Sequence, residues 1–355
     1  MSYDDGWAAL NLEMPKRIPR TEYSAESHWE LINAVTGIPV TLDSADDLKN
    51  QARKTFTSPE YWNYDFFWNT GIGGSFLGKY RTNMGHAVYA AGGTDYNDNI
   101  TSLFETPEDV LKFDPMEDLD IPDHRKTVEF FTSHYQNAVE KHSTGVNMAG
   151  TYISCISGLI DMFGWDMLLM AMGIDPEKMG HLTNRYAEYM QHYYNALAEA
   201  HVPVVMIHDD IVWTSGPFTS PDWYREYVFP NYKKYIAPLK DSNKKIMYTS
   251  DGNYSMFIDD LVDCGFEAFA MEPTTDMKYI AEKYGKTHSF IGNADTRILL
   301  SGSREDIRNE VKRCMDIGKD CPGFVMAVGN HIPSNTPVKN AIYYNEVYES
   351  MAIRD

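Results

Sequence analysis

The chain has 355 residues and carries 31 Lys and Arg against 51 Asp and Glu, a net charge of −20 at pH 7. This acidic balance, without a basic stripe, excludes the usual electrostatic footprint of a nucleic-acid-binding protein and disfavours a polyanionic substrate. The lack of a leader-like start, of a membrane-length apolar run and of a CxxC pair predicts a cytoplasmic protein with no membrane partner.

The N-terminal third of the sequence is polar, aromatic and irregular. Residues 1–60 are expected to form an N-terminal arm, in which helical patterns occupy 28–34 and 48–55. Strand candidates follow at 61–69 and 84–91. The glycine cluster between these strands lacks the GxGxxG pattern of a phosphate loop, so we interpret it as a turn. Residues 95–123 are acidic and rich in proline, which is typical of a long surface loop.

From residue 124 onward, helical patterns and short apolar runs alternate along the chain. Each apolar run is short enough to be a strand, and the longer amphipathic segments between the runs are helices. Strands are predicted at 146–150, 204–207, 246–248, 266–271, 288–292 and 323–328, and helices at 124–142, 158–172, 176–200, 221–239, 255–264 and 304–316.

The strand candidates number eight when the two earlier ones are included, and most are separated by helices. Alternation of this kind favours a parallel sheet, and eight such units over this length favour a closed (β/α)8 barrel of the TIM type over an open sheet. We therefore expect an α/β protein with a single domain, in which residues 61–355 form the barrel and residues 1–60 pack on it as an N-terminal extension.

Polar side chains stand directly after the later strands. In a closed barrel these strand ends meet at one rim, so we expect the side chains to converge on one cavity. Carboxylates and imidazoles are ligands that zinc or a similar divalent metal accepts, but the same groups also suit metal-free acid–base catalysis. The candidate residues are His208, Asp210, Asp251, Glu272, Asn293, Asp295, Asn330 and His331.

Structural roles are open for several of these residues. His208, next to two aspartates, suits a hydrogen-bonded structural histidine as well as a ligand, and Asp251 before Gly252 suits a turn. Asp295, Glu310 and His331 form an acid–acid–His series. Because Glu310 lies inside the predicted helix 304–316, we expect it on the solvated outer face of the barrel.

Aromatic side chains near predicted loops and strand ends form a second group. They would wall a pocket for an aromatic substrate, although core packing is an alternative for each of them. These residues are Tyr23, Phe66, Trp68, Trp213, Tyr248 and Phe257.

Several stretches together resemble the uroporphyrinogen decarboxylase superfamily. They are HDDIVWTSG at 208–216, SPDWYREY at 220–227, SDGN at 250–253 and GNAD at 292–295, with VKNA at 338–341 similar to a closing segment. The resemblance covers most of the chain from about Ala149 onward, and its first part is looser. It implies a distorted (β/α)8 barrel and one of two chemistries, decarboxylation or corrinoid-dependent methyl transfer.

The resemblance favours the methyltransferase branch. Decarboxylases of the superfamily grip substrate carboxylates with an arginine-rich motif near the N-terminus, and the matching place here holds only Arg17 and Arg20. Members that methylate thiols hold zinc with cysteines, where this chain has Asp251 and His331. Oxygen and nitrogen ligands make a harder metal site, which suits an oxygen-bearing substrate. The chain thus resembles aryl methyl ether O-demethylases.

This resemblance implies a role for each candidate. The expected metal ligands are Asp251, Glu272 and His331, which would hold zinc against the ether oxygen. His208 is expected to be a fourth ligand or a proton donor. The residues expected to orient the site are Asp210, Tyr248 and Asp295. The resemblance implies a small methylated aromatic substrate and cobalamin supplied by a corrinoid carrier protein. The rivals are a metal-independent decarboxylase and an idle barrel that only binds. The expected substrate-binding residues are Tyr23, Phe66, Trp68, Trp213, Asn293 and Asn330.

Overall fold

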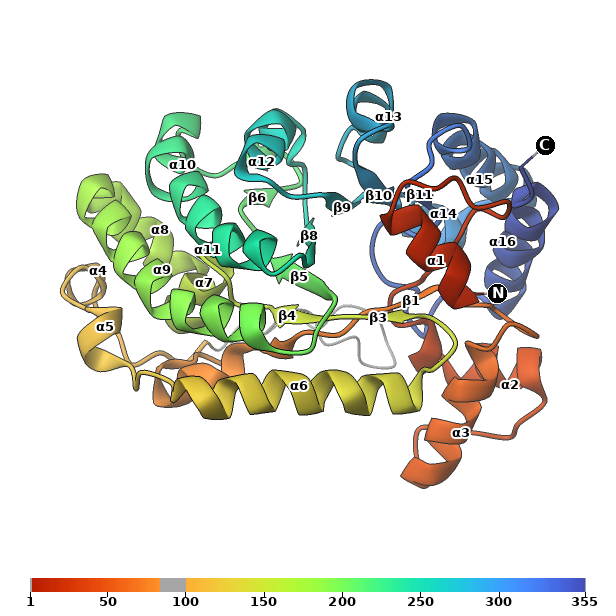
Figure 1. Cartoon of the computed structure of the whole chain (residues 1–355), viewed down its shortest axis with the longest axis horizontal. Helices are drawn as coiled ribbons and strands as arrows, with labels where there is room; N and C mark the ends of the chain where they lie inside the picture. Colours follow the sequence, from red (N-terminus) through yellow and green to blue (C-terminus); the bar gives the residue numbers. More distant parts are fainter. Residues whose placement is uncertain (1, 84–99, 355) are drawn as a thin grey trace.

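The computed structural model describes residues 2–83 and 100–354 (Figure 1). The strand predicted at 84–91 therefore lies outside the described residues. Within them, parallel strands form one continuous sheet, in which each strand is hydrogen-bonded to the next. In spatial order these strands are β2 (Gly71–Ile72), β4 (Ala149–Thr151), β5 (Val204–His208), β8 (Lys245–Ser250), β9 (Ala268–Met271), β10 (Ser289–Ile291) and β11 (Phe324–Val325).

Two further strand pairs flank this sheet. β1 (Phe66–Phe67) pairs in parallel with β3 (Val146–Asn147), directly upstream of the pairing between β2 and β4. β1 and β3 therefore extend the part of the barrel wall that β2 and β4 form. A short antiparallel hairpin of β6 (Val212–Trp213) and β7 (Gly216–Pro217) rises after β5.

The N-terminal segment 19–23 lies between the first and last strands of the barrel wall. On one side, the backbone N–H of Thr21 donates to the carbonyl of Met326 at 3.0 Å. On the other side, the N–H of Asp65 donates to the carbonyl of Arg20 at 2.8 Å. The predicted α/β barrel of the TIM type is confirmed, and a segment that the sequence analysis assigns to an arm fills the gap between β11 and β1.

Helices cover the outside of the barrel, as Figure 1 shows. The predicted helix at 158–172 is two helices, because Gly164 at φ 76° breaks it. The helix predicted at 221–239 is also two, because Pro230 stands in the first turn of the second one. The helices are α1 (Ser2–Leu10), α2 (Trp29–Thr36), α3 (Asp46–Phe56), α4 (Pro107–Val110), α5 (Pro115–Asp118), α6 (His124–Lys141), α7 (Ile156–Phe163), α8 (Trp165–Ile174), α9 (Pro176–Glu199), α10 (Pro221–Tyr227), α11 (Phe229–Asp241), α12 (Ile258–Cys264), α13 (Met277–Tyr284), α14 (Thr296–Ser301), α15 (Arg304–Gly318) and α16 (Val338–Met351).

None of the described helices is by itself long and apolar enough to span a membrane. α7 and α8 pass on length and composition only when they are taken together, with a bend of 108° between them. Every residue of α7 is buried in the protein, which is how a core helix of a globular fold behaves.

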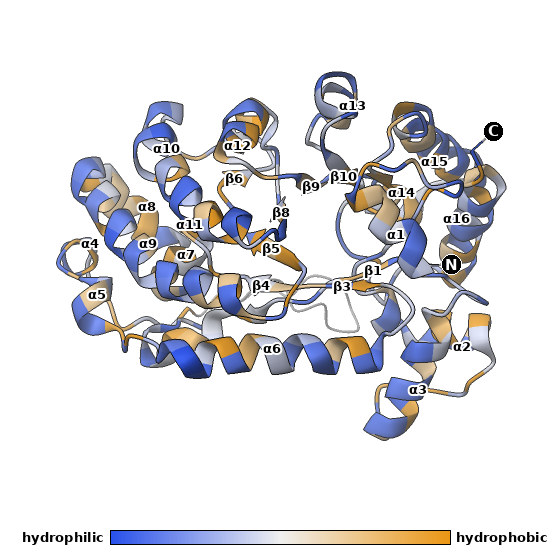
Figure 2. Ribbon diagram, viewed as in Figure 1, coloured by the Kyte–Doolittle hydropathy of each residue, from blue (hydrophilic) through white to orange (hydrophobic). Residues whose placement is uncertain are grey.

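Two apolar clusters hold the barrel together. The inner cluster fills the barrel and includes Phe66, Met206 and Met247, while a larger outer cluster joins the strands to the helices. Figure 2 shows hydrophobic residues on the strands and hydrophilic residues over much of the outer helices. α1 packs against the inner cluster, where the Ser289 hydroxyl donates to the carbonyl of Ala9 at 2.9 Å. A filled interior leaves the C-terminal strand ends as the place for a ligand.

Candidate active site

A cavity of about 220 Å³ lies at the C-terminal ends of the strands, which we call the reaction cavity. It receives side chains from β5, from the end of β8 and from the loop after β11, as expected for a barrel of parallel strands. It is lined by Tyr23, Ser24, Glu26, Trp68, Tyr152, Met206, His208, Thr249, Ser250, Asp251, Met271, Gly329, Asn330 and His331.

Backbone hydrogen bonds to carboxylates join neighbouring strand ends at this rim. The N–H of Asp251 donates to Oδ1 of Asp210 at 2.8 Å, and the N–H of Gly252 donates to Oε2 of Glu272 at 3.0 Å. The side-chain amide of Asn330 donates to the other oxygen of Glu272. Carboxylates from β5 and β9 therefore clamp the loop after β8, whose own carboxylate faces the cavity.

Gly252 makes this clamp sterically possible. Its φ is +82°, and a Cβ at this position would lie 2.7 Å from the backbone carbonyl carbon of Trp213. Only glycine accepts both the left-handed conformation and the close approach. The sequence analysis interpreted Asp251-Gly252 as a possible turn, and the turn exists, but it also serves to present Asp251 to the cavity.

The carboxyl groups at the rim hold their protons unusually tightly. Burial raises the pKa of Asp210 to about 7, and the nearby carboxylates Asp209 and Glu272 add to this rise. Desolvation, followed by repulsion from Asp210 and Glu272, raises the pKa of Asp251 well above its usual value. A carboxyl that lies beside other carboxylates holds its proton more tightly than an isolated one. This rim can therefore donate a proton.

The histidines of the reaction cavity are neutral. Burial lowers the pKa of His208 to about 4 and that of His331 to about 4. His208 stacks on Tyr152 with ring centroids 3.7 Å apart, and its Nε2 lies 3.3 Å from Oδ1 of Asp210. The hydroxyl of Ser24 is hydrogen-bonded to Nδ1 of His331. Both rings serve as polar walls without charge.

Aromatic rings form the opposite wall of the reaction cavity. Tyr23 stacks on Trp68 with centroids 4.3 Å apart, and its ring meets His331 edge-on at 6.2 Å. Tyr23 belongs to the segment that completes the barrel wall, and Trp68 follows β1. The predicted aromatic pocket thus includes Tyr23 and Trp68, and a planar ligand could stack against them.

The expected metal ligands do not form a metal site in this arrangement. Asp251 and His331 both line the reaction cavity, but no three His, Cys, Asp or Glu side chains among residues 2–83 and 100–354 are grouped to hold an ion. Both oxygens of Glu272 already accept hydrogen bonds from Gly252 and Asn330. The donor set therefore does not fit the zinc site that the resemblance implies.

Asp209, which the sequence analysis passed over, anchors a helix instead of lining the cavity. Its buried carboxylate accepts hydrogen bonds from the N–H groups of Cys155, Ile156 and Ser157 at 2.6 to 3.1 Å, at the start of α7. The hydroxyl of Tyr248 donates to the backbone carbonyl of Asp209 at 3.0 Å. The structure therefore places Tyr248, an expected catalytic residue, in the core behind the rim.

The loop after β10 stands behind the rim. The side-chain amide of Asn293 donates to the carbonyls of Glu272 and Thr275, both at 3.1 Å. Asp295 forms an ion pair with Arg297, with atoms 2.7 Å apart. These residues were expected to bind substrate and to orient the site; in the structure Asn293 holds the backbone of Glu272, and Asp295 is engaged by Arg297.

The expectation of a solvated Glu310 is wrong. Glu310 is buried, and its carboxylate accepts from the N–H of Asp295 at 2.9 Å and pairs with Arg313. The side chain of Arg313 also donates to the carbonyl of Asn293 at 3.0 Å. α15 thus turns this acidic residue toward the loop after β10, because Arg313 and a backbone N–H compensate its charge there.

The remaining aromatic candidates lie away from the reaction cavity. Phe66 belongs to the inner cluster, and Phe257 is fully buried against Tyr224, so both pack in the core. Trp213 is 43% exposed on β6, beside Trp165. Sequence reasoning missed Tyr152, although Tyr152 also follows a predicted strand and could have been expected at the same rim.

Residues 92–350 match a family model described as uroporphyrinogen decarboxylase (URO-D). The uroporphyrinogen decarboxylase of Carboxydothermus hydrogenoformans is 26% identical over 177 residues, which is 50% of this chain and 49% of that protein. That of Geobacter sulfurreducens is 25% identical over 182 residues, 51% of this chain and 52% of that protein. The aligned part of the chain thus spans about half the length of these curated relatives.

Among solved structures, a methyltransferase from Methanosarcina mazei has the same fold as this chain. The TM-score is 0.64 at 18% sequence identity, and the match covers 98% of both chains. The agreement over nearly the full length includes the N-terminal segment as well as the barrel strands.

Proposed function

The chain belongs to the uroporphyrinogen decarboxylase family, and we propose that it is a methyltransferase of that family. In this proposal it moves a methyl group from a small methoxylated aromatic substrate to the cobalt of a corrinoid that a separate carrier protein supplies. The observation that carries the proposal is the proton-holding pair Asp210 and Asp251 at an aromatic cavity. An ether oxygen leaves readily only when its developing charge is neutralised.

The charge of the reaction cavity favours a methyl ether over a polycarboxylic acid. Among its described lining residues there is no arginine or lysine. The two arginines at the N-terminus have other partners: Arg17 pairs with Asp5 and Asp65, and Arg20 pairs with Glu22. A substrate with several carboxylates would meet carboxyl groups here without a compensating cation, which is costly in a desolvated site. This disfavours the metal-independent decarboxylase.

The proposed reaction uses Asp251 as the acid. Its carboxyl gives a proton to the substrate oxygen as the bond between that oxygen and the methyl carbon breaks, so that the product leaves as a neutral phenol. The bonding electron pair stays on the oxygen, and the methyl group passes to the acceptor. Asp210 positions Asp251 through the backbone hydrogen bond and raises its proton affinity by repulsion.

The rim offers apolar surface for a large flat cofactor. Trp213 is 43% exposed and Met256 is 57% exposed, in the loops that follow β5 and β8. Aromatic and thioether side chains pack well against an extended ring system. A reduced corrinoid, when bound there, supplies the nucleophile that accepts the methyl group. The proposed reaction does not use zinc, because the donor side chains among the described residues do not fit a zinc site.

Incubation of the purified protein with reduced cobalamin and a panel of methoxylated phenols tests the proposal. We expect the visible spectrum of methylcobalamin to appear with one or more of these phenols, together with the demethylated phenol in chromatography. The matched variant Asp251→Asn keeps the size of the side chain and removes the acid, so it should slow the reaction by roughly 10²-fold or more.

Failure of every methoxylated phenol to methylate cobalamin, combined with release of carbon dioxide from a porphyrinogen carboxylic acid, would support the decarboxylase instead. An unchanged rate in Asp251→Asn would remove the acid from the mechanism. Absence of both activities in folded protein would favour a barrel that only binds.

A further inference from the structure

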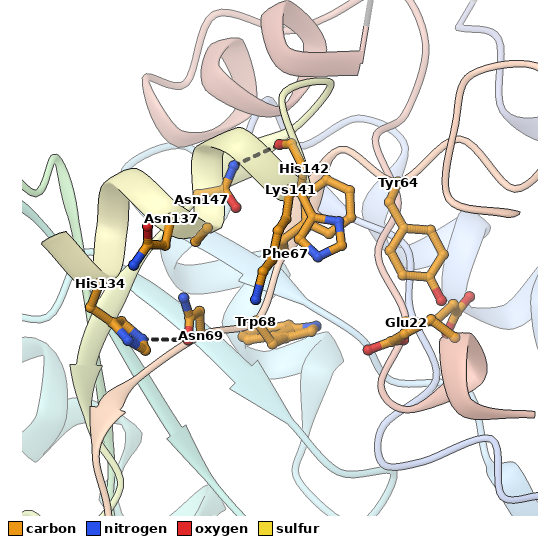
Figure 3. Close-up of a pocket in the computed structure, with 12 residues that line it drawn as sticks. Glu22, Tyr64, Phe67, Trp68, Asn69, His134, Asn137, Lys141, His142 and Asn147 are labelled. Carbon is orange, nitrogen blue, oxygen red and sulfur yellow. Dashed lines mark hydrogen bonds between the residues drawn. The ribbon is translucent and has the colours of Figure 1, made fainter. Parts of the chain in front are cut away.

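A second cavity, of about 310 Å³, lies beside the reaction cavity, and we call it the outer cavity. It is bounded by the end of β1, by β3 and by α6, and it shares Glu26 and Trp68 with the reaction cavity. Its volume is at the lower end of the range for small-molecule sites. The lining residues are Glu22, Glu26, Tyr64, Phe67, Trp68, Asn69, His134, Asn137, Ala138, Lys141, His142 and Asn147 (Figure 3).

Polar atoms without partners are concentrated in the outer cavity. Of the twelve buried side-chain N and O atoms without a hydrogen bond in the described part of the chain, five belong to its lining. Tyr64 is 1% exposed and Asn147 is 2% exposed. Buried polar groups are normally paired, so this concentration indicates a ligand or water in the cavity. The five atoms are Glu26 Oε2, Tyr64 Oη, Trp68 Nε1, His142 Nδ1 and Asn147 Oδ1.

Opposite charges face this cavity without pairing with each other. Lys141 is exposed at the end of α6, and no ion pair to it occurs among the residues that the structure describes. Figure 3 shows its amine reaching toward Trp68 and Asn69, with Glu22 and Tyr64 on the other side. Glu22 is already paired with Arg20 and Tyr344. Glu26 is the acidic lining residue with one oxygen unpartnered; burial raises its pKa, and the nearby Arg53 opposes that rise.

Aromatic side chains also line the outer cavity. Phe67 stacks on His142 with centroids 4.3 Å apart, and Trp68 borders the cavity in Figure 3. Burial lowers the pKa of His142 to about 4, so its ring is neutral. The aromatic part of the wall is thus uncharged, and it suits the apolar body of a ligand that carries charge at both poles.

We propose that the outer cavity binds a zwitterion of amino-acid size with an apolar body. Its carboxylate pairs with Lys141, its ammonium group approaches Glu26, and its body packs on Phe67 and Trp68. A zwitterion offers an ion-pair partner to Lys141 and to Glu26 at once, and its ammonium group favours the ionised form of Glu26. A simple anion leaves Glu26 without a cation, and a simple cation leaves Lys141 without an anion.

This site can be tested apart from the proposed reaction, although the two cavities share Glu26 and Trp68. Its defining cation, Lys141, does not line the reaction cavity, and Asp251 does not line the outer cavity. Binding there needs no corrinoid and no methylated substrate. A failure of the zwitterion site therefore leaves the proposed methyl transfer intact, and the reverse also holds.

Isothermal titration calorimetry of the full chain with matched probes tests the proposal. The probes are L-phenylalanine, 3-phenylpropanoate, which lacks the ammonium group, and 2-phenylethylamine, which lacks the carboxylate. We expect saturable binding of L-phenylalanine and affinities lower by about tenfold or more for the other two. Lys141→Ala should lower the affinity for L-phenylalanine by about tenfold and leave the affinity for 2-phenylethylamine unchanged. Glu26→Gln should lower the affinity for L-phenylalanine and leave the affinity for 3-phenylpropanoate unchanged.

Lys126→Ala is the matched control, because it removes a lysine from the exposed surface of the same helix away from the cavity. It should bind L-phenylalanine as the wild type does. No saturable binding of L-phenylalanine at about 10 mM would overturn the proposal. Equal affinity for 3-phenylpropanoate would also overturn it, in favour of an anion site, as would binding that Lys141→Ala does not change.

Discussion

The backbone N–H of Asp251 donates a hydrogen bond to Oδ1 of Asp210 at 2.8 Å, which joins the ends of the neighbouring strands β8 and β5. The same contact holds the two carboxyl groups close together at the rim, where repulsion from Asp210 adds to the effect of burial in raising the pKa of Asp251. One hydrogen bond thereby contributes to the shape of the loop and to the chemistry of the reaction cavity.

Asp251→Asn should lower kcat for methyl transfer by roughly 10²-fold or more, because general acid assistance is worth about that much. KM should change little, since the amide keeps the volume of the side chain. The rate of methylcobalamin formation measures the effect. Asp295→Asn is the control, because Asp295 pairs with Arg297 and does not line the reaction cavity; an equal loss in both variants would contradict a specific role for Asp251.

The rate of methyl transfer should fall as pH rises, because the proton on the acid Asp251 is lost on the alkaline side of its raised pKa. The pKa of Asp210 is raised to about 7 and that of Asp251 is raised with it. Below this range the coupled pair holds the proton that the leaving oxygen needs, and above it the proton is lost. A pH–rate profile from pH 5 to 9 checks the sign, at roughly tenfold per unit on the alkaline limb. A rate that rises with pH over this range would rule out an acid role.

Asp210→Asn should stabilise the protein at alkaline pH. Because the pKa of Asp210 is raised from 3.8 in the unfolded chain to about 7 in the folded state, the folded state loses stability as pH rises between these values. Removing the charge should raise the free energy of unfolding at pH 8 by on the order of 2 kcal/mol, with little change near pH 4. Urea unfolding at both pH values measures this difference, and equal effects would contradict it.

Glu272→Ala should destabilise the fold as well as the site. It leaves the N–H of Gly252 and the side-chain amide of Asn330 without their acceptor. The cost should be about 1–3 kcal/mol in the free energy of unfolding, as for other lost charge-assisted hydrogen bonds. Chemical denaturation measures it, and Glu272→Gln, which keeps one acceptor oxygen, should cost less. A variant as stable as the wild type would show that water replaces the carboxylate.

Trp68→Ala should raise KM for an aromatic substrate by roughly tenfold, because it removes the ring that stacks on Tyr23 at 4.3 Å. The effect on kcat should be smaller, since Trp68 is not near the proton-holding pair by any described contact. Steady-state kinetics separates the two parameters. Trp213→Ala serves as the comparison, because Trp213 stands at the rim outside the cavity lining.

Much of the reaction cavity could be located from local sequence pattern, because polar residues that directly follow parallel barrel strands meet at one rim. Runs of apolar residues mark buried strands, and parallel strands of a barrel end at one rim, so residues such as His208 and Asp251 could be predicted to meet there. The rule depends only on the period and the order of elements, which neighbouring residues determine. It does not depend on which way each side chain points.

Side-chain direction and long-range pairing were decided by the tertiary structure. The barrel wall gains the segment 19–23 through backbone hydrogen bonds to residues more than 40 positions away, and no local pattern marks those partners. Glu310 is buried because Arg313 and the N–H of Asp295 reach it. The carboxylate of Glu272 accepts hydrogen bonds from Gly252 and Asn330 and does not join Asp251 and His331 around a shared ion.

The amino-acid sequence by itself therefore determined the α/β barrel, the family and the rim on which the candidate residues stand, because these follow from periodicity, spacing and short motifs. Only the tertiary structure decided which carboxyl groups face one another, which acids are engaged by backbone N–H groups, and that a second cavity with unpaired polar atoms adjoins the first. Those features arise from contacts between segments far apart in the chain, whose energies depend on burial and geometry that no single stretch of sequence contains.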